Sequence, residues 1–465
     1  METRHLNSMQ TSTQGRKATD RTRLHRSLNY GSGPSQVLFR GFAPLRLCLM
    51  ILLVSLSCTA ATAQEVEDTI RIKTRVVFLD ALVKDKKTNL PISNLAQENF
   101  EVVDNGKTRS ISYFTREGQA RKPLALILIL DLRDDGAGRF LKKPEITKAM
   151  EDQLAKLPAV DEVAIMAMDI GEDEKRIWVT QFTNERSKIA AALAKVQSIC
   201  AAHAEQSDER VAQDKQPAAG TEQAAKESKE AADSKDPSTD PKAIVSTEVI
   251  KGKNGTLTRR IRRDGSSDVT RTNKKGNVTI EMEGIYDMAS AIQDAARQAQ
   301  VMRPNSQLSI VWISDGIAPI FFEDREASEQ ALIRSNVIFN SLTVELRTLF
   351  KFLLPIGKPI AGWMGLSLYG SAKYLAQQSG GEAVKVGSAK DYGTGLARII
   401  GNLTARYSLG FALAEDEMDD GKMHSLEVRV KAKDEKGKNR KLLVSSRQGY
   451  YMSSVAPKDT AAKAQ

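Results

Sequence analysis

The sequence predicts an α/β fold, in which a doubly wound, mainly parallel sheet is accompanied by an accessory β-domain formed by N- and C-terminal segments. Three observations support this prediction. LALILILD (residues 124–131) is a continuous apolar run, as expected of a parallel strand buried on both faces. Residues 122–406 alternate strand-like and helix-like patterns, which is typical of a doubly wound sheet. The flanking segments 64–121 and 407–453 contain mainly strand patterns.

Residues 1–63 have the pattern of an export signal. Eight Lys or Arg and two acids give this segment a charge of +6, and the apolar run LCLMILLVSL (47–56) leads to Ala61-Thr62-Ala63. A basic region, a short apolar run and small residues at a cleavage site are features of a secretory signal peptide. A buried core helix and a retained membrane anchor are the alternatives. Cleavage after Ala63 leaves Cys200 as the only cysteine, so no disulfide is expected within the mature chain.

Residues 64–121 are expected to form an N-terminal β-region. TRVVFLDALVKD (74–85) alternates imperfectly between apolar and polar side chains. FEVVDNGKTRSISYF (100–114) carries the pair Asn105-Gly106 between two strand-like runs. Asn-Gly favours the two-residue turn of a β-hairpin, because both positions need a positive φ. This region precedes the α/β domain, which we place at residues 122–406.

The α/β domain is predicted from the periodicity of its segments. In KPEITKAMEDQLAKL (143–157), Ile146, Met150, Leu154 and Leu157 share one helical face. The hairpin partner of strand 161–170 is expected at 175–183. The other expected strands are 124–131, 307–315, 337–344 and 382–386, and the other expected helices are 184–196, 284–300, 326–336, 367–381 and 391–407.

An insertion at residues 200–280 interrupts this alternation. Residues 201–240 nearly lack large apolar side chains and carry a net charge of −5, so they are predicted to be disordered. Residues 241–280 carry a net charge of +7, and regularly spaced turn pairs predict a basic β-meander, with a solvated arm as the alternative. Such an arm would suit an anionic partner. The candidate partner-binding cations in it are Arg259, Arg260, Arg262 and Arg263.

A second insertion, residues 350–366, is an apolar loop. It contains two prolines and Trp363, which makes it a candidate partner-contact site, although packing against the domain itself is the favoured interpretation. After residue 407 the chain returns to strand patterns, and residues 407–453 are expected to pair with the N-terminal β-region. Residues 454–465 are predicted to be a disordered tail.

The order of these motifs resembles the von Willebrand factor A-related domain proteins of the acidobacterial type. The segments that carry the resemblance are VVFLDALVKDKKTNLPISNLAQENFEVVDNGKTRSISYF, LALILILD, DEVAIMAMD, QFTNERSKIAAAL, EGIYDMASAI, IVWISDG, YSLGFAL and RQGYYM. The resemblance covers roughly residues 68–453, apart from the two insertions. It implies a von Willebrand A fold, a central sheet flanked by helices, in an exported protein.

The resemblance also implies a metal-ion-dependent adhesion site, but the site is degenerate here. The family pattern is Asp-x-Ser-x-Ser after the first strand, a Thr before a later helix and an Asp after the fourth strand. Asp131 and Asp315 match the two acids. Arg133 and Asp135 stand at the serine positions, and Ile285 stands at the threonine position. Three of the five ligand positions have therefore lost the hydroxyl of the family pattern. This weakens the site, because a hard cation such as Mg²⁺ or Mn²⁺ needs oxygen ligands.

The two acids at this edge need a counter-charge, and the sequence offers two. In the favoured hypothesis no metal cofactor is expected, because the Arg133 guanidinium pairs with Asp131 or Asp315 in its place. In the alternative, Asp135 or Asp134 replaces a serine oxygen and the site keeps Mg²⁺ or Mn²⁺. A third interpretation is that Asp131 only caps the segment that follows it.

The remaining chemistry argues against an enzyme. There is no phosphate-binding loop, no GxSxG elbow and no metal-binding Cys/His cluster. Much of the net charge of +10 lies in residues 1–63, so the basic pI is weak evidence for nucleic-acid binding. We therefore expect an exported, non-enzymatic scaffold, in the periplasm or at the cell surface, that binds a protein or an anionic envelope component. Cation-dependent adhesion is the alternative, and an unrecognised hydrolase is the least favoured.

Overall fold

The computed structural model describes most of the chain after residue 74, within the compact unit Lys73–Gln465. The described ranges are 75–116, 121–132, 137–170, 174–214, 240, 243–252, 255–263, 267–275, 279–285, 288–314, 320–344, 366–367, 370–414, 416–417, 420–433 and 436–452. The predicted signal peptide, the predicted tail, Arg133, Asp134, Asp135, Asp315 and Trp363 lie outside these ranges. No helix among the described residues combines the length and apolar character that crossing a membrane requires.

A six-stranded sheet forms the centre of the α/β domain, as predicted. Its strand order is β16-β14-β12-β5-β6-β7. Five strands run parallel and β7 pairs antiparallel with β6. The strands are β5 (Leu124–Asp131), β6 (Glu162–Ile170), β7 (Glu174–Thr183), β12 (Gln307–Ser314), β14 (Val337–Val344) and β16 (Ala383–Val386). Every residue of β5 is buried, which explains its uninterrupted apolar sequence.

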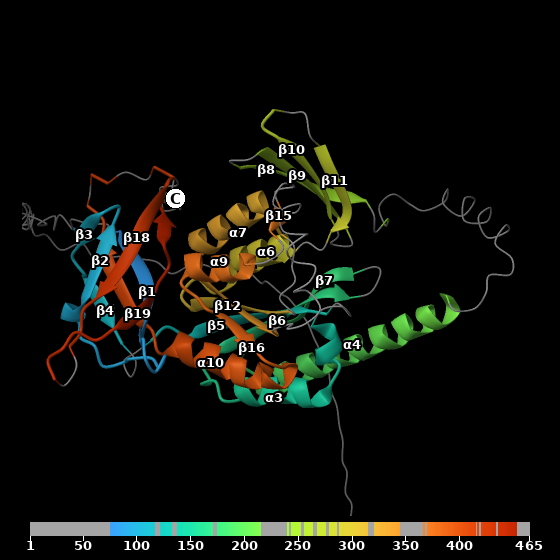
Figure 1. Cartoon of the computed structure of the whole chain (residues 1–465), viewed down its shortest axis with the longest axis horizontal. Helices are drawn as coiled ribbons and strands as arrows, with labels where there is room; N and C mark the ends of the chain where they lie inside the picture. The colour runs from blue at the N-terminus through green and yellow to red at the C-terminus, as the bar shows by residue number, and fades with distance from the viewer. Residues whose placement is uncertain are drawn as a thin grey trace, which may run out of the picture. The chain divides into compact units, whose positions relative to one another are not determined.

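Helices cover both faces of this sheet (Figure 1). Leu126 and Leu128 of β5 belong to the core beneath one set of helices, and Ile127 and Ile129 belong to the core beneath the other. The first set is α2 (Gly138–Leu141), α3 (Pro144–Leu154), α4 (Arg186–Asp214) and α10 (Tyr392–Thr404), and the second is α6 (Met288–Met302), α7 (Phe322–Arg334) and α9 (Ser371–Ser379). The shorter elements are the 3-10 helices η2 (Gln97–Asn99) and η3 (Ala389–Asp391) and the strands β13 (Ile320–Phe321) and β15 (Leu366–Ser367).

The two ends of the described chain build one β-domain, as predicted. It consists of two four-stranded sheets, ordered β19-β1-β17-β4 and β20-β18-β2-β3. The N-terminal strands are β1 (Val76–Asp85), β2 (Phe100–Asp104), β3 (Lys107–Arg109) and β4 (Tyr113–Thr115), and the C-terminal strands are β17 (Tyr407–Ala412), β18 (Met423–Val430), β19 (Leu442–Ser445) and β20 (Gly449–Tyr451). Asn105 and Gly106 have φ values of 47° and 82°, as the expected hairpin turn requires.

The insertion at residues 200–280 differs in part from its prediction. The expectation of disorder from residue 201 is wrong up to Asp214, because α4 continues to that residue. Ala, Gln, Glu and Arg are strong helix formers, so a segment without large apolar residues can still extend a helix that is already anchored. The basic part forms a four-stranded antiparallel meander of β8 (Ile244–Lys251), β9 (Gly255–Arg262), β10 (Ser267–Asn273) and β11 (Thr279–Ile285).

The β-domain contacts the α/β domain near the amino ends of the parallel strands. Gln448 donates a backbone hydrogen bond of 2.9 Å to the carbonyl oxygen of Gln378, five residues before β16 begins. The Arg334 guanidinium, just before β14, lies 3.9 Å from the ring centroid of Tyr451. The carboxyl ends of the strands therefore lie at the opposite edge of the sheet.

Candidate functional site

Asp131 and Ser314 mark the point where the order of the sheet reverses. After β5 the chain adds β6 and β7 on one side, and it later adds β12 on the other side of β5. In open α/β sheets, ligands bind outside the carboxyl ends of the strands at such a switch point. Asp131 ends β5 and Ser314 ends β12, so two neighbouring strands bring an acid and a hydroxyl to this position.

The Asp131 carboxylate is held in a defined orientation. Its residue is 4% exposed, and Ser314 is completely buried. Ser314 Oγ donates a hydrogen bond of 2.8 Å to Asp131 Oδ2. The hydroxyl of Tyr392, the first residue of α10, donates a hydrogen bond of 3.4 Å to the Ser314 carbonyl oxygen. The buried acid therefore lies where the ends of β5 and β12 meet the start of α10.

The described part of the site does not by itself fit a divalent cation. Asp131 supplies one carboxylate and Ser314 one hydroxyl. Residue 285, at the threonine position of the family pattern, is an isoleucine at the end of β11. Within the described ranges, no group of three or more His, Cys, Asp or Glu side chains is arranged to hold a metal ion. The other expected participants, Arg133, Asp135 and Asp315, lie outside those ranges.

Of the four arginines predicted to bind a partner, Arg259 requires a correction. Its residue is 1% exposed, and its guanidinium forms ion pairs with Asp324 at the start of α7 and with Glu248 of β8. Strand alternation explains the error, because Arg259 and Leu257 share the buried face of the meander while Arg260 points to the other face. Arg259 therefore anchors the meander to α7.

The other three arginines lie nearer the surface. Arg260 and Arg263 are exposed. Arg262 is partly exposed and pairs with Asp268 of β10 at 2.5 Å. A second anchor joins Arg271 of β10 to Glu323 of α7 at 3.5 Å. The meander is thus fixed by buried arginines and presents other cations outward.

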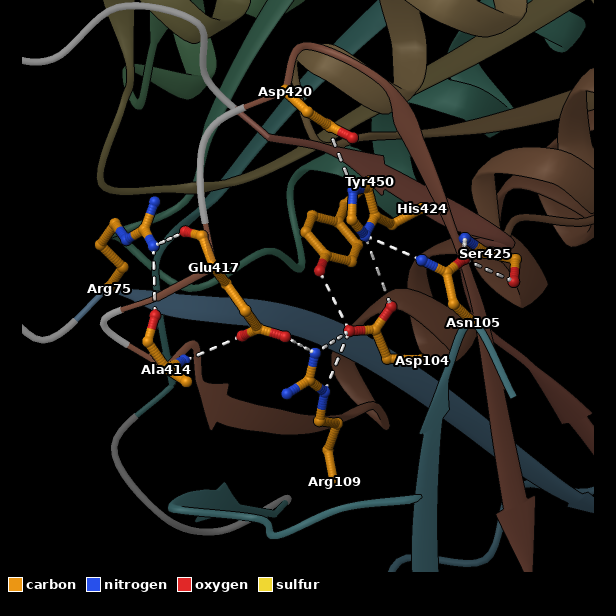
Figure 2. Close-up of polar contacts among 10 residues, drawn as sticks. All are labelled: Arg75, Asp104, Asn105, Arg109, Ala414, Glu417, Asp420, His424, Ser425 and Tyr450. Atoms are coloured by element: carbon orange, nitrogen blue, oxygen red, sulfur yellow. Dashed lines mark hydrogen bonds and ion pairs between the residues drawn. The ribbon is translucent and has the colours of Figure 1, made fainter. Parts of the chain in front are cut away.

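The β-domain contains a buried polar cluster, which Figure 2 shows. It was not predicted from the sequence. Asp104, at the end of β2, is 1% exposed. Its Oδ2 accepts hydrogen bonds from Arg109 Nε at 3.0 Å, Arg109 Nη2 at 2.7 Å and the Tyr450 hydroxyl at 3.1 Å. Arg109 also forms an ion pair with Glu417 in the loop after β17. Asp104 and Tyr450 are 346 residues apart, so no local pattern connects them.

Asn105 connects this cluster to His424 of β18. Asn105 Oδ1 accepts a hydrogen bond of 2.9 Å from the Ser425 backbone, so its amide group faces the imidazole. Asn105 Nδ2 lies 2.9 Å from His424 Nδ1, which must therefore accept the bond, leaving the proton on Nε2. His424 Nε2 lies 3.3 Å from Asp420. These contacts attach the turn of the β2–β3 hairpin to β18.

Several groups in the cluster have shifted pKa values, and the shifts of Glu417 and Tyr450 bear directly on its hydrogen bonds. The hydrogen bond from Arg109 lowers the pKa of Glu417. Burial and the neighbouring Asp104 carboxylate raise the pKa of Tyr450, so its hydroxyl remains a donor at neutral pH. The shifts favour an ionised Glu417 and a protonated Tyr450, which are the forms that the observed hydrogen bonds require. The cluster therefore stabilises the hairpin and the loop after β17.

The comparisons with known proteins concern the fold alone. No protein-family model and no curated protein matches the sequence. The von Willebrand A domain of SpRpn10 is 10% identical, covering 57% of this chain and 88% of its own, with a TM-score of 0.26. The von Willebrand factor domain of the type V pili tip protein Mfa5 from Porphyromonas gingivalis is 11% identical, covering 61% and 96%, with a TM-score of 0.24.

The pilus adhesin SpaC from Lactobacillus rhamnosus GG, in an open conformation, is also similar. It is 7% identical over 77% of this chain, with a TM-score of 0.31, and the match spans 48% of the adhesin. This chain thus matches about half the length of the adhesin. The α/β domain itself has a mainly parallel sheet flanked by helices, and further β-sheets accompany it.

Proposed function

We propose that this protein is an exported, non-enzymatic scaffold that binds a partner protein through the carboxyl edge of its parallel sheet. The observation that carries the proposal is the buried Asp131–Ser314 hydrogen bond at the switch point of the sheet. The bond joins the last residues of two neighbouring parallel strands. In open α/β sheets, ligands bind at this edge.

The described contacts of the β-domain lie away from this edge. Its contacts with the α/β domain, through Gln448 and Tyr451, lie near the opposite, amino edge. Exposed Arg260 and Arg263 on the meander favour a partner with acidic groups. The partner would therefore meet the carboxyl edge and the meander together.

The charge balance of the site is part of the proposal. We infer that Arg133 replaces the divalent cation of the family by pairing with Asp131 or Asp315. Asp131 is already bonded to Ser314, so one guanidinium with several donors would complete the charge neutralisation without metal ligands. Recognition would then not require Mg²⁺ or Mn²⁺.

The test is site-specific photo-crosslinking in the source cells. Lys390 of η3 is exposed beyond the end of β16, at the carboxyl edge, and Lys156 is exposed before β6, at the amino edge. A photoreactive residue at position 390 is expected to capture a specific protein, and the same residue at 156 is not. The 390 adduct should decrease when Arg260 and Arg263 are replaced by Glu. Equal capture at both edges, or no protein adduct at 390, would overturn the proposal.

A further inference from the structure

Lys84, Glu382 and Asn402 form a compact arrangement between the β-domain and the α/β domain. Lys84 Nζ lies 3.0 Å from Glu382 Oε1 and 3.1 Å from Glu382 Oε2. Asn402 Nδ2 donates a hydrogen bond of 2.5 Å to the same Oε2. The amine of a lysine and the amide of an asparagine therefore share one carboxylate oxygen.

The three residues come from separate parts of the fold. Lys84 is near the end of β1 in the β-domain, Glu382 immediately precedes β16, and Asn402 is in the last turn of α10. Lys84 is 5% exposed and Asn402 is 6% exposed. A buried lysine amine and a buried side-chain amide held by one carboxylate have the components of an acyl-transfer reaction.

We propose that Lys84 and Asn402 form an intramolecular amide bond, with Glu382 transferring the proton. Lys84 passes a proton to Glu382, and its neutral Nζ attacks Asn402 Cγ. The Nζ–Cγ bond forms, the Cγ–Nδ2 bond breaks, and protons from Nζ reach Nδ2 through Glu382. Ammonia leaves, and no oxidant, reductant or cofactor is needed.

The electrostatics of the site act on both partners. Burial lowers the pKa of Lys84 even though Glu382 pairs with it, which favours the nucleophilic amine. Burial alone would raise the pKa of Glu382, but the bonds and charges of Lys84 and Arg398 outweigh burial and lower it. The positive charges of Arg398 and Arg406 also lower the pKa of Lys84. Arg398 therefore favours both the neutral amine of Lys84 and the ionised form of Glu382.

The bond would connect β1 covalently to α10. Almost the whole α/β domain lies between the two residues in the chain. The single described cysteine, Cys200, is buried and forms no disulfide, so the covalent restraint would come from an amide.

Intact mass spectrometry of the protein purified from cells tests the proposal, with the N-terminus identified by sequencing. The mass is expected to be lower than the sequence mass by one ammonia molecule, and a protease digest should contain a branched peptide joining Lys84 to Asn402. Lys84→Arg and Asn402→Ala should restore the full sequence mass, and Lys188→Arg, at an exposed lysine, should keep the loss.

The intact mass of the wild-type protein tests the amide bond even where a variant fails to fold. A wild-type mass equal to the sequence mass, unchanged after prolonged incubation of the folded protein, would overturn the proposal. Glu382→Gln should slow formation at least tenfold. An ammonia loss located at another residue pair would equally contradict the assignment.

Discussion

Ser314 Oγ donates a 2.8 Å hydrogen bond to Asp131 Oδ2, which joins the carboxyl ends of β12 and β5. Both residues are buried, and each is the last residue of its strand. The acid found in the sequence as a potential metal ligand therefore has a protein partner on the neighbouring strand. This bond holds together the edge at which we place partner recognition.

Removing the serine hydroxyl should destabilise the α/β domain. Ser314→Ala leaves a buried carboxylate oxygen without this donor, and such a loss costs about 1–3 kcal/mol. The free energy of unfolding, measured by urea denaturation, should fall by that amount. Ser198→Ala, at an exposed serine of α4, serves as the control and should change it by less than about 0.5 kcal/mol. Equal effects from both variants would mean that the Asp131 bond contributes no more than a surface contact.

Metal dependence distinguishes the arginine hypothesis from cation-dependent adhesion. The native protein is expected to unfold at the same temperature with Mg²⁺, Mn²⁺ or EDTA. Arg133→Ser restores a hydroxyl and removes the guanidinium, so this variant should be stabilised by the metal. A ligand at about 100 times its Kd adds roughly 2.7 kcal/mol to the free energy of unfolding. Metal stabilisation of the native protein would contradict the replacement of the cation by Arg133.

The sequence predicted those features that depend on local patterns. The apolar run of β5 identified the buried central strand, and Asn105-Gly106 identified the hairpin between β2 and β3. Asp131 was found because an acid that ends a buried strand is visible in the sequence. Its partner Ser314 was not found, because the hydrogen bond joins residues 183 positions apart and depends on the register between β5 and β12.

Other features depend on information that the sequence does not carry locally. The face on which Arg259 lies was not predicted, because consecutive arginines fit either face of a strand. The Asp104 cluster and the Lys84–Glu382–Asn402 arrangement bring together residues from opposite ends of the chain. Their members are common polar residues with no diagnostic spacing. Only the pairing of β1 with β17 and of β2 with β18 places them together.

The anchor between the meander and α7 should depend on Arg259. Arg259→Ala leaves Asp324 buried without its main cation, and breaking a buried pair in this way costs about 3–5 kcal/mol. Hydrogen exchange of residues 243–285 should become faster while exchange in β5 stays unchanged. Arg260→Ala, one residue further on the exposed face, is the matched control and should leave exchange as in the wild type. Unchanged protection in Arg259→Ala would contradict this role and show that the Arg271–Glu323 pair alone holds the meander on α7.

The stability of the β-domain should depend on pH through Glu417. The hydrogen bond from Arg109 lowers the pKa of this carboxylate below its ordinary value of 4.5. The folded state therefore binds the proton more weakly than the unfolded state does. The contribution of Glu417 is fully present above pH 4.5 and is lost as pH falls through its lower folded pKa. Glu417→Gln should accordingly reduce the loss of stability between neutral and acid pH, measured by chemical denaturation at each pH.

Glu98→Gln, at an exposed carboxylate of η2, is the control and should keep the wild-type pH profile. If Glu417→Gln also keeps that profile, the Arg109–Glu417 pair does not contribute to stability in solution.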